Sequence, residues 1–289
     1  MPTLSQRLLP AAIIAVALIG LYWPFLGALI QDWGENPDYS HGYFIPFVVA
    51  YMVYSRRRQL AETIARPMNS GLIVVLLGLM LLIVGKISSE FFAQRLSFIV
   101  VLLGLTAFFG GRPFLSLFAS PVLYLIFMIP LPAIIWNQIA FPMQIFSTTL
   151  TEKVIYAMGI PVFREGNVLH LAETTLEVVA ACSGLRSLLT MFALAGALAF
   201  FSGFSRWRKT ALFFSAAPVA ILANIIRLTG TAFLANIYGA KVAEGFLHEF
   251  SGLVVFFLGL LMLIGVHNLL AWRAAGGGRL TCPPSSDWP

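Results

Sequence analysis

The sequence predicts an all-α polytopic membrane protein with about eight transmembrane helices. Of its 289 residues, 59% are hydrophobic and 10% are charged, and the mean hydropathy is +0.89. A chain with so few charges cannot cover a water-soluble globule, and its apolar runs recur at lengths that cross a bilayer. The net charge of +6 does not indicate nucleic-acid binding, because the basic residues lie in short loops between the apolar runs.

Taken in chain order, the apolar runs predict the spans one by one, and the second run is short for a membrane crossing. The expected spans cover residues 10–30, 42–55, 70–86, 91–110, 114–131, 183–203, 210–235 and 250–272. The first run has no clear small-residue cleavage site, so we expect an uncleaved span rather than a signal peptide. These spans form one integral membrane domain over residues 1–274, and the Gly- and Pro-containing residues 275–289 are expected to be a disordered cytoplasmic tail.

Residues 132–182 differ from the spans and predict a small extracytoplasmic cap. Polar residues and prolines break the apolar pattern there, so we expect an amphipathic helix that lies on the membrane and ends near residue 158. Residues 166–171 and 174–179 are β-prone and bounded by turn residues, which predicts a β-hairpin.

Charge asymmetry predicts the orientation, because cytoplasmic loops carry an excess of Lys and Arg. With the N-terminus inside, the cap, Cys182 and His248 lie outside. Most of the 18 basic residues then lie on the cytoplasmic side, namely Arg7, Arg56, Arg57, Arg58, Arg66, Arg112, Arg206, Arg208, Lys209, Arg273 and Arg279.

Cys182 is the thiol at a plausible reaction site, since the second cysteine of the chain, Cys282, lies in the polar tail. A cysteine at a helix N-terminus meets unpaired N–H groups and the positive end of the helix dipole, which favour the thiolate. Ser183 and Gly184 suit such a helix entry and leave N–H groups for an oxyanion, while Arg186 lies one turn further on the same face. The alternative is that Cys182 is a small buried apolar residue.

Arg227 lies inside a long apolar run, where a charge is costly unless it faces protein or water. Asn224 lies three residues earlier on the same helical face, and the pair could hold a carbonyl oxygen or an oxyanion. The alternatives are that Arg227 reaches the outer interface or pairs structurally with a carboxylate such as Glu177.

His248 precedes the last apolar run and follows Glu244 by four residues. If this stretch is helical, Glu244 could orient the imidazole, and His248 could act as base to the thiol and acid to a leaving amine. His41 is a rival base, because it is also expected outside and near a short span. A lone membrane-interface histidine can also be only an anchor.

These residues also resemble those of a known family, the exosortases, which are bacterial membrane cysteine transpeptidases related to archaeosortases. The resemblance covers nearly the whole chain in order. It rests on Ala181-Cys182-Ser183-Gly184-Leu185-Arg186-Ser187, Asn224 with Arg227, His248 before the final span, Tyr39-Ser40-His41-Gly42, Arg56-Arg57-Arg58 and Gly159-Ile160-Pro161-Val162.

The resemblance implies a sortase-like enzyme in the bacterial inner membrane with its active site facing the periplasm. Its substrates would be exported proteins with a C-terminal Pro-Glu-Pro motif, a transmembrane helix and a basic cluster. By that analogy Cys182 is the nucleophile that forms a thioester, Arg227 stabilises the oxyanion or positions the substrate, and His248 is the general base and acid. No metal or organic cofactor is implied, and membrane lipid surrounds the chain.

Two other classes of protein remain open from the sequence. A transporter or lipid-binding protein would use Arg227 and Asn224 to bind an anionic group, but apart from Arg95 and Arg186 the spans show little to line a charged pathway. A thiol–disulfide enzyme would need a second thiol on the face of Cys182, and Cys282 is expected on the other face.

Overall fold

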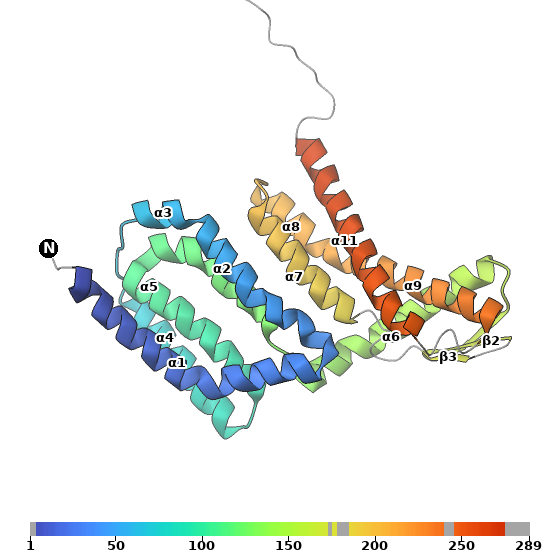
Figure 1. The fold of residues 1–289 in the computed structure, drawn as a ribbon, viewed down its shortest axis with the longest axis horizontal. Helices are drawn as coiled ribbons and strands as arrows, with labels where there is room; N and C mark the ends of the chain where they lie inside the picture. The colour runs from blue at the N-terminus through green and yellow to red at the C-terminus, as the bar shows by residue number, and fades with distance from the viewer. Residues whose placement is uncertain (1–3, 173–174, 178–184, 240–245, 275–289) are drawn as a thin grey trace, which may run out of the picture. The chain divides into compact units, whose positions relative to one another are not determined.

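The computed structural model describes residues 4–172, 175–177, 185–239 and 246–274, and these residues are mostly helical (Figure 1). The chain divides into two compact units, residues 1–139 and 140–289, with the boundary inside helix α6. In chain order the elements are α1 (Leu4–Glu35), η1 (Pro37–Phe44), α2 (Ile45–Ser55), α3 (Arg57–Glu62), α4 (Ser70–Ile87), α5 (Phe91–Tyr124), η2 (Leu125–Met128), α6 (Ala133–Ala157), β1 (Val162–Glu165), β2 (Val168–Leu171), β3 (Thr175–Glu177), α7 (Leu185–Phe201), α8 (Arg206–Phe214), α9 (Ala216–Tyr238) and α11 (Phe246–Ala274).

Five helical segments in the described part of the chain are long and apolar enough to cross a membrane, which agrees with a multi-pass membrane protein. They are Ala12–Glu35, Ser70–Ile87, Phe91–Met128, Arg206–Tyr238 and Gly252–Arg273, and the shorter Leu185–Phe201 is also apolar.

The structure does not confirm the expected count of about eight spans. Of the expected span 42–55, only the 11 residues of α2 form an α-helix, and such a helix is about 16 Å long. The expected spans 91–110 and 114–131 are joined as α5, which has a kink at Gly111.

The kink in α5 depends on a glycine because Gly111 has a φ of +70°. A Cβ atom added at this position would lie 1.7 Å from the carbonyl oxygen of Arg66, so a larger residue would collide with the chain that leads into α4. Arg66 N–H also donates to the carbonyl oxygen of Gly110, at 3.1 Å. Close packing of this segment therefore fixes where α5 bends.

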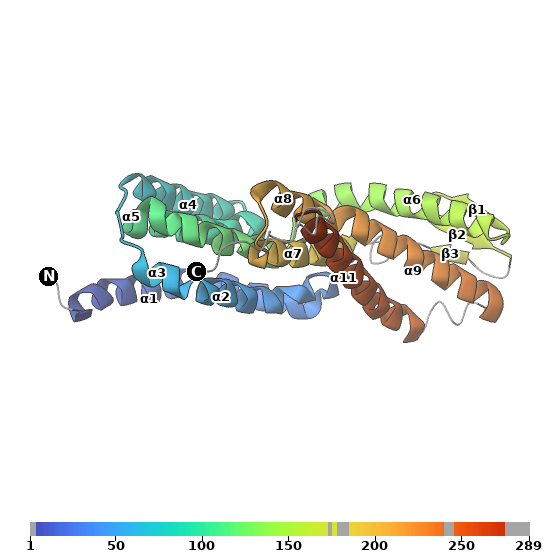
Figure 2. The ribbon, with the colours of Figure 1, turned by 90° about the horizontal axis from the view of Figure 1, so that it is seen from above.

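Helices α4 and α5 lie side by side in both ribbon views, with glycines where their backbones approach (Figure 2). Gly78 packs against Val101, and Gly104 packs against Val75. Small residues allow such close approach between membrane helices, where water supplies no hydrophobic driving force for packing.

We expect Gly71→Ala to destabilise this helix pair. The added Cβ would lie 2.3 Å from the backbone nitrogen of Phe108, and overpacking of this kind costs about 1–3 kcal/mol. Gly27→Ala in α1 is the control, because its Cβ would meet no atom within 4 Å. The measurement is the melting temperature of the detergent-solubilised protein, which should fall only for Gly71→Ala; equal values for both variants would contradict this packing.

Polar contacts connect α1 to the segments that follow it in the first unit. Arg95, which is 8% exposed, donates to a carboxylate oxygen of Asp32 at 2.5 Å, and Tyr22 and Ser97 share a hydrogen bond of 3.0 Å. Trp33 Nε1 donates to the carbonyl oxygen of Met128 at 2.8 Å. The Arg95 charge therefore has a carboxylate partner, as a charge within a spanning helix requires.

In the second unit, a three-stranded antiparallel sheet of order β1-β2-β3 follows α6. The expected hairpin is present as β2 and β3, where Val168 pairs with Glu177. Strand β1 pairs with β2 across a two-residue turn at Gly166 and Asn167, and Gly166 has the positive φ that such a turn requires. Leu169 of the sheet packs in one buried cluster with Ile155 of α6 and Ala232 of α9.

Helices α7, α8, α9 and α11 share the other core of the second unit. Small side chains dominate its buried surface, so these helices can approach one another closely. The buried members are Met191, Ala195, Ala199, Leu212, Ala216, Ala220 and Leu263. Helix α7 packs against both α9 and α11.

Candidate active site

Residues of α7, α9 and α11 enclose a pocket of about 100 Å³ in the second unit, which we call the arginine pocket. Two guanidinium groups from different helices line it, and none of the described residues that line it is acidic. The lining residues are Arg186, Ser187, Thr190, Arg227, Gly252, Val255 and Phe256. The pocket therefore suits a small anionic or strongly polarised oxygen group.

Arg227 enters this pocket from the polar face of α9. Asn224, three residues earlier, is 1% exposed, and Ala223 and Leu228 beside the pair are also buried. Leu222 and Ile226 are 49% and 52% exposed, so they form the outward face of the same helix. The Asn224–Arg227 face thus turns toward neighbouring helices, which is where a charge within a membrane helix is tolerated.

Arg186 enters the arginine pocket from the first turn of α7. The preceding Leu185 is 1% exposed and anchors the start of the helix. Thr190 Oγ1 donates to the carbonyl oxygen of Arg186 at 2.9 Å, so this hydroxyl serves the helix backbone. The two arginines are therefore the strongest hydrogen-bond donors among the described lining residues.

The expected nucleophile and its neighbours lie outside the described residues. Cys182, Ser183 and Gly184 immediately precede Leu185, and Glu244 precedes α11. Leu185 is the third residue after Cys182, and three residues of extended chain span at most about 11 Å. Covalent connectivity thus keeps Cys182 within that reach of the helix start that carries Arg186.

His248 is the third residue of α11 and lies one helical turn before Gly252, a wall of the arginine pocket. Residues four apart share a helical face, so position 248 lies on the face of α11 that lines the pocket. The flanks of Cys182, the Arg227 helix and the helix of His248 therefore meet at one place.

His41, the rival base, lies in η1 of the first unit and is hydrogen-bonded to the backbone there. Its Nε2–H donates to the carbonyl oxygen of Phe127 at 3.1 Å. Burial lowers the pKa of His41, while hydrogen bonds to the backbone of Phe127 and Asp38 oppose this shift. Nε2 of His41 is thus held by the backbone of η2.

A model of the transmembrane exosortase family matches residues 33–265, which include every element from η1 to most of α11. The chain belongs to the transmembrane exosortase family. Membership implies a transpeptidase role and exported protein substrates at the level of the family. Comparisons with curated proteins and with solved structures found no match.

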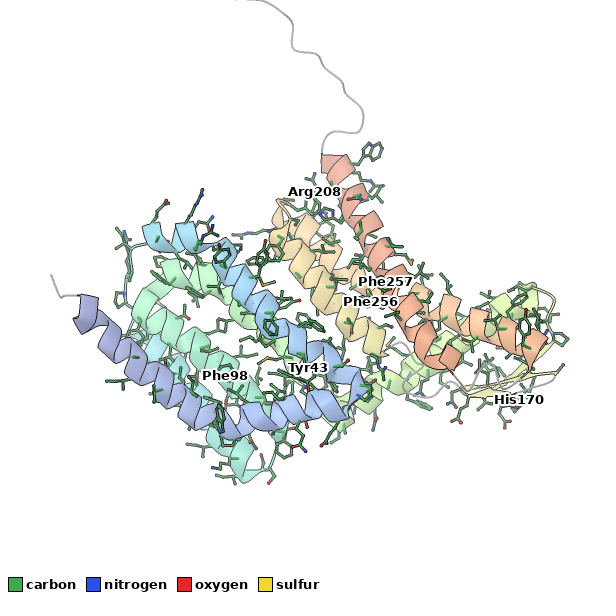
Figure 3. The ribbon with its side chains drawn as sticks, in the orientation of Figure 1. Tyr43, Phe98, His170, Arg208, Phe256 and Phe257 are labelled. Atoms are coloured by element: carbon green, nitrogen blue, oxygen red, sulfur yellow. The ribbon has the colours of Figure 1, made fainter. Side chains whose placement is uncertain are left out.

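The sequence reasoning missed several pocket residues of this exosortase, namely Thr190, Gly252, Val255 and Phe256. Their spacing was the available signal, because 252, 255 and 256 share one helical face that begins one turn after His248. In Figure 3, Phe256 and Phe257 lie on α11 where this helix passes α7. Phe256 lines the pocket, whereas Phe257 is 52% exposed.

A second, larger pocket of about 470 Å³ lies in the first unit of the exosortase and was also missed. Three carboxylates spaced three residues apart line it, those of Asp32 and Glu35 in α1 and Asp38 in η1. This regular spacing is visible in the sequence and could have indicated the pocket. The lining residues are Asp32, Glu35, Asn36, Pro37, Asp38, Tyr39, Pro130, Leu131, Ala133 and Trp136. Burial raises the pKa of Tyr39 to about 12, and its hydroxyl accepts a hydrogen bond from Leu131 N–H.

Within the described residues, no group of three or more His, Cys, Asp or Glu side chains is placed to hold a metal ion.

Proposed function

We propose that this exosortase is a sortase-like cysteine transpeptidase or protease that acts at the outer, periplasmic face of the bacterial inner membrane. Its substrates are exported proteins with a C-terminal Pro-Glu-Pro signal, a transmembrane helix and a basic cluster. The observation that carries the proposal is the arginine pocket, where Arg227 meets the first turn of α7 and the early part of α11. The start of α7 follows Cys182 in the chain, and the start of α11 carries His248.

In the proposed first step, the Cys182 thiolate attacks the carbonyl carbon of the scissile peptide bond. The C–N bond breaks, His248 gives a proton to the leaving amine, and a thioester joins the substrate to Cys182. The released product is the membrane-bound tail of the substrate. Its transmembrane helix would bind laterally among the spans, which presents the signal at the outer surface.

In the second step, an acceptor attacks the thioester carbonyl carbon and the C–S bond breaks, which restores the Cys182 thiolate. His248 removes the proton of the acceptor in this step. An amine acceptor gives transpeptidation and water gives hydrolysis. The transpeptidase role of the family favours the amine.

Arg227 and Asn224 would stabilise the negative charge that develops on the carbonyl oxygen. Donors held in a water-poor site act strongly on such an oxyanion because they need no rearrangement during the reaction. Arg186 would hold a positive charge near the Cys182 thiol and so favour its thiolate form. We assign the base to His248 rather than His41, because Nε2 of His41 is bonded to Phe127.

Two observations weigh against a transporter or lipid-binding protein. Arg95, one of the few cations in the spans, is paired with Asp32. The arginine pocket, at about 100 Å³, is also far below the roughly 300–1,000 Å³ of pockets that enclose whole small molecules.

A labelling experiment tests the topology on which this chemistry depends. In a Cys282→Ser background, Cys182 is the single cysteine of the chain. A membrane-impermeant maleimide should label it from the periplasmic side of intact spheroplasts, because a nucleophile must be accessible to its substrate. Cys182→Ala in the same background is the control. Labelling that requires access from the cytoplasmic side would contradict the proposed orientation.

A further inference from the structure

We infer that the arginine pocket is a specificity subsite that holds one carboxylate side chain of the substrate, with Arg186 as its main partner. This inference rests on the proposed function and adds a role for the pocket beyond oxyanion stabilisation. The Glu of the Pro-Glu-Pro signal is the carboxylate that the proposed substrate supplies.

The charges of the pocket support an anionic occupant. Arg186 and Arg227 come from different helices and line the same small space, and the described lining residues include no acid. A guanidinium offers its N–H donors in a planar fork that matches the two oxygens of a carboxylate. Arg186 is exposed, so an entering side chain can reach it without a rearrangement of α7.

The apolar wall of the pocket suits the stem of such a side chain. Val255 is 4% exposed and Phe256 is partly buried, and both line the pocket from α11, whereas the arginines line it from α7 and α9. A Cβ atom added at Gly252 would meet no atom within 4 Å, so open space lies beside this glycine. The methylene groups of a glutamate could pack on this wall while its carboxylate contacts Arg186.

The volume of the pocket separates a side chain from a larger ligand. At about 100 Å³, the pocket is far smaller than the roughly 300–1,000 Å³ of pockets that enclose whole small molecules. This space accommodates one carboxylate with its short stem, but not a phospholipid headgroup together with its glycerol. The size therefore favours the substrate side chain over lipid as the source of the anion.

A double-mutant cycle tests the inference with a tagged exported protein that carries the signal. The enzyme is wild type or Arg186→Gln, and the signal carries either its Glu or a Gln. Each single change should lower kcat/KM by about 10–100-fold, because either change breaks the same charge-assisted contact. Arg186→Gln should lower kcat/KM much less for the Gln substrate than for the Glu substrate, and the loss that remains with the Gln substrate reflects the effect of Arg186 on the Cys182 thiol. Arg164→Gln in β1, whose arginine pairs with Glu152 outside the pocket, should be additive with the substrate change.

Equal losses in Arg186→Gln for the Glu and Gln substrates would overturn the inference. The proposed function would still stand in that case, provided that the wild type processes the substrate and Cys182→Ala does not. The reactions are run in vesicles of zwitterionic lipid and again with anionic lipid added. If Arg186→Gln changed only the response to anionic lipid, the occupant would be a lipid headgroup and the inference would be wrong.

A steric variant tests the same subsite without altering its charges. Gly252→Leu places a side chain in the open space of the pocket wall, whereas Gly265→Leu places one in open space elsewhere on α11. We expect Gly252→Leu to lower processing of the Glu substrate at least 10-fold and to affect a substrate with Ala at that position less. Gly265→Leu should process both substrates like the wild type. Equal effects of the two leucines, or of Gly252→Leu on the two substrates, would contradict the subsite.

Discussion

Cys182→Ala is expected to abolish processing of a tagged substrate, while the variant still inserts in the membrane and purifies as a folded protein. Alanine lacks the nucleophile, so no acyl-enzyme can form. Cys182→Ser should be inactive or nearly so, because a serine hydroxyl is not ionised at neutral pH as a thiolate can be. The measurement is the appearance of the cleaved product on a gel over time.

The other cysteine supplies the control for this prediction. Cys282→Ser removes a thiol from the polar tail and should process the substrate at the wild-type rate. Full processing by Cys182→Ala would end the proposal that the chain is a cysteine enzyme.

Arg227→Ala is expected to lower the single-turnover rate of processing by about 10²–10³, because the loss of one oxyanion donor has an effect of this size. Arg227→Lys should recover part of the rate, since an ammonium keeps the charge but not the planar fork of donors. The rate of product release from purified enzyme in lipid vesicles provides the measurement.

The neighbour of Arg227 on α9 is the matched control. Ile226 is 52% exposed and lies on the outward face of the helix, so Ile226→Ala should stay close to the wild-type rate. A wild-type rate in Arg227→Ala would remove this arginine from the reaction. A loss of similar size in Ile226→Ala would indicate that the helix, rather than the guanidinium, is disturbed.

Local sequence signals predicted the parts of the fold that depend on local chemistry. The turn residues at Gly166 and Asn167 indicated β structure in this part of the chain. The pairing of β1 with β2 and the kinked continuation of α5 were missed, because they depend on contacts with other segments. The contact between Gly111 and Arg66 joins residues that are distant in sequence.

In the candidate site too, the sequence could predict residues that stand out by their local chemistry but not those brought in by helix packing. Arg227 and Asn224 were readable from the sequence because polar groups in an apolar run are costly and therefore conspicuous. Gly252 and Val255 carry no such mark in an apolar helix. Their place in the wall of the arginine pocket results from the packing of α11 against α7 and α9, which no local pattern encodes.

Trapping of the acyl-enzyme tests the central claim, that Cys182 forms a thioester, most directly. Wild-type enzyme is incubated with a verified substrate under slow turnover, and the mixture is separated on a denaturing gel without thiols. We expect a covalent enzyme–substrate band that neutral hydroxylamine removes and that Cys182→Ala never forms, since a transporter or a thiol–disulfide enzyme has no reason to make one. Processing of the substrate without such a band, or a band that persists in Cys182→Ala, would contradict the account.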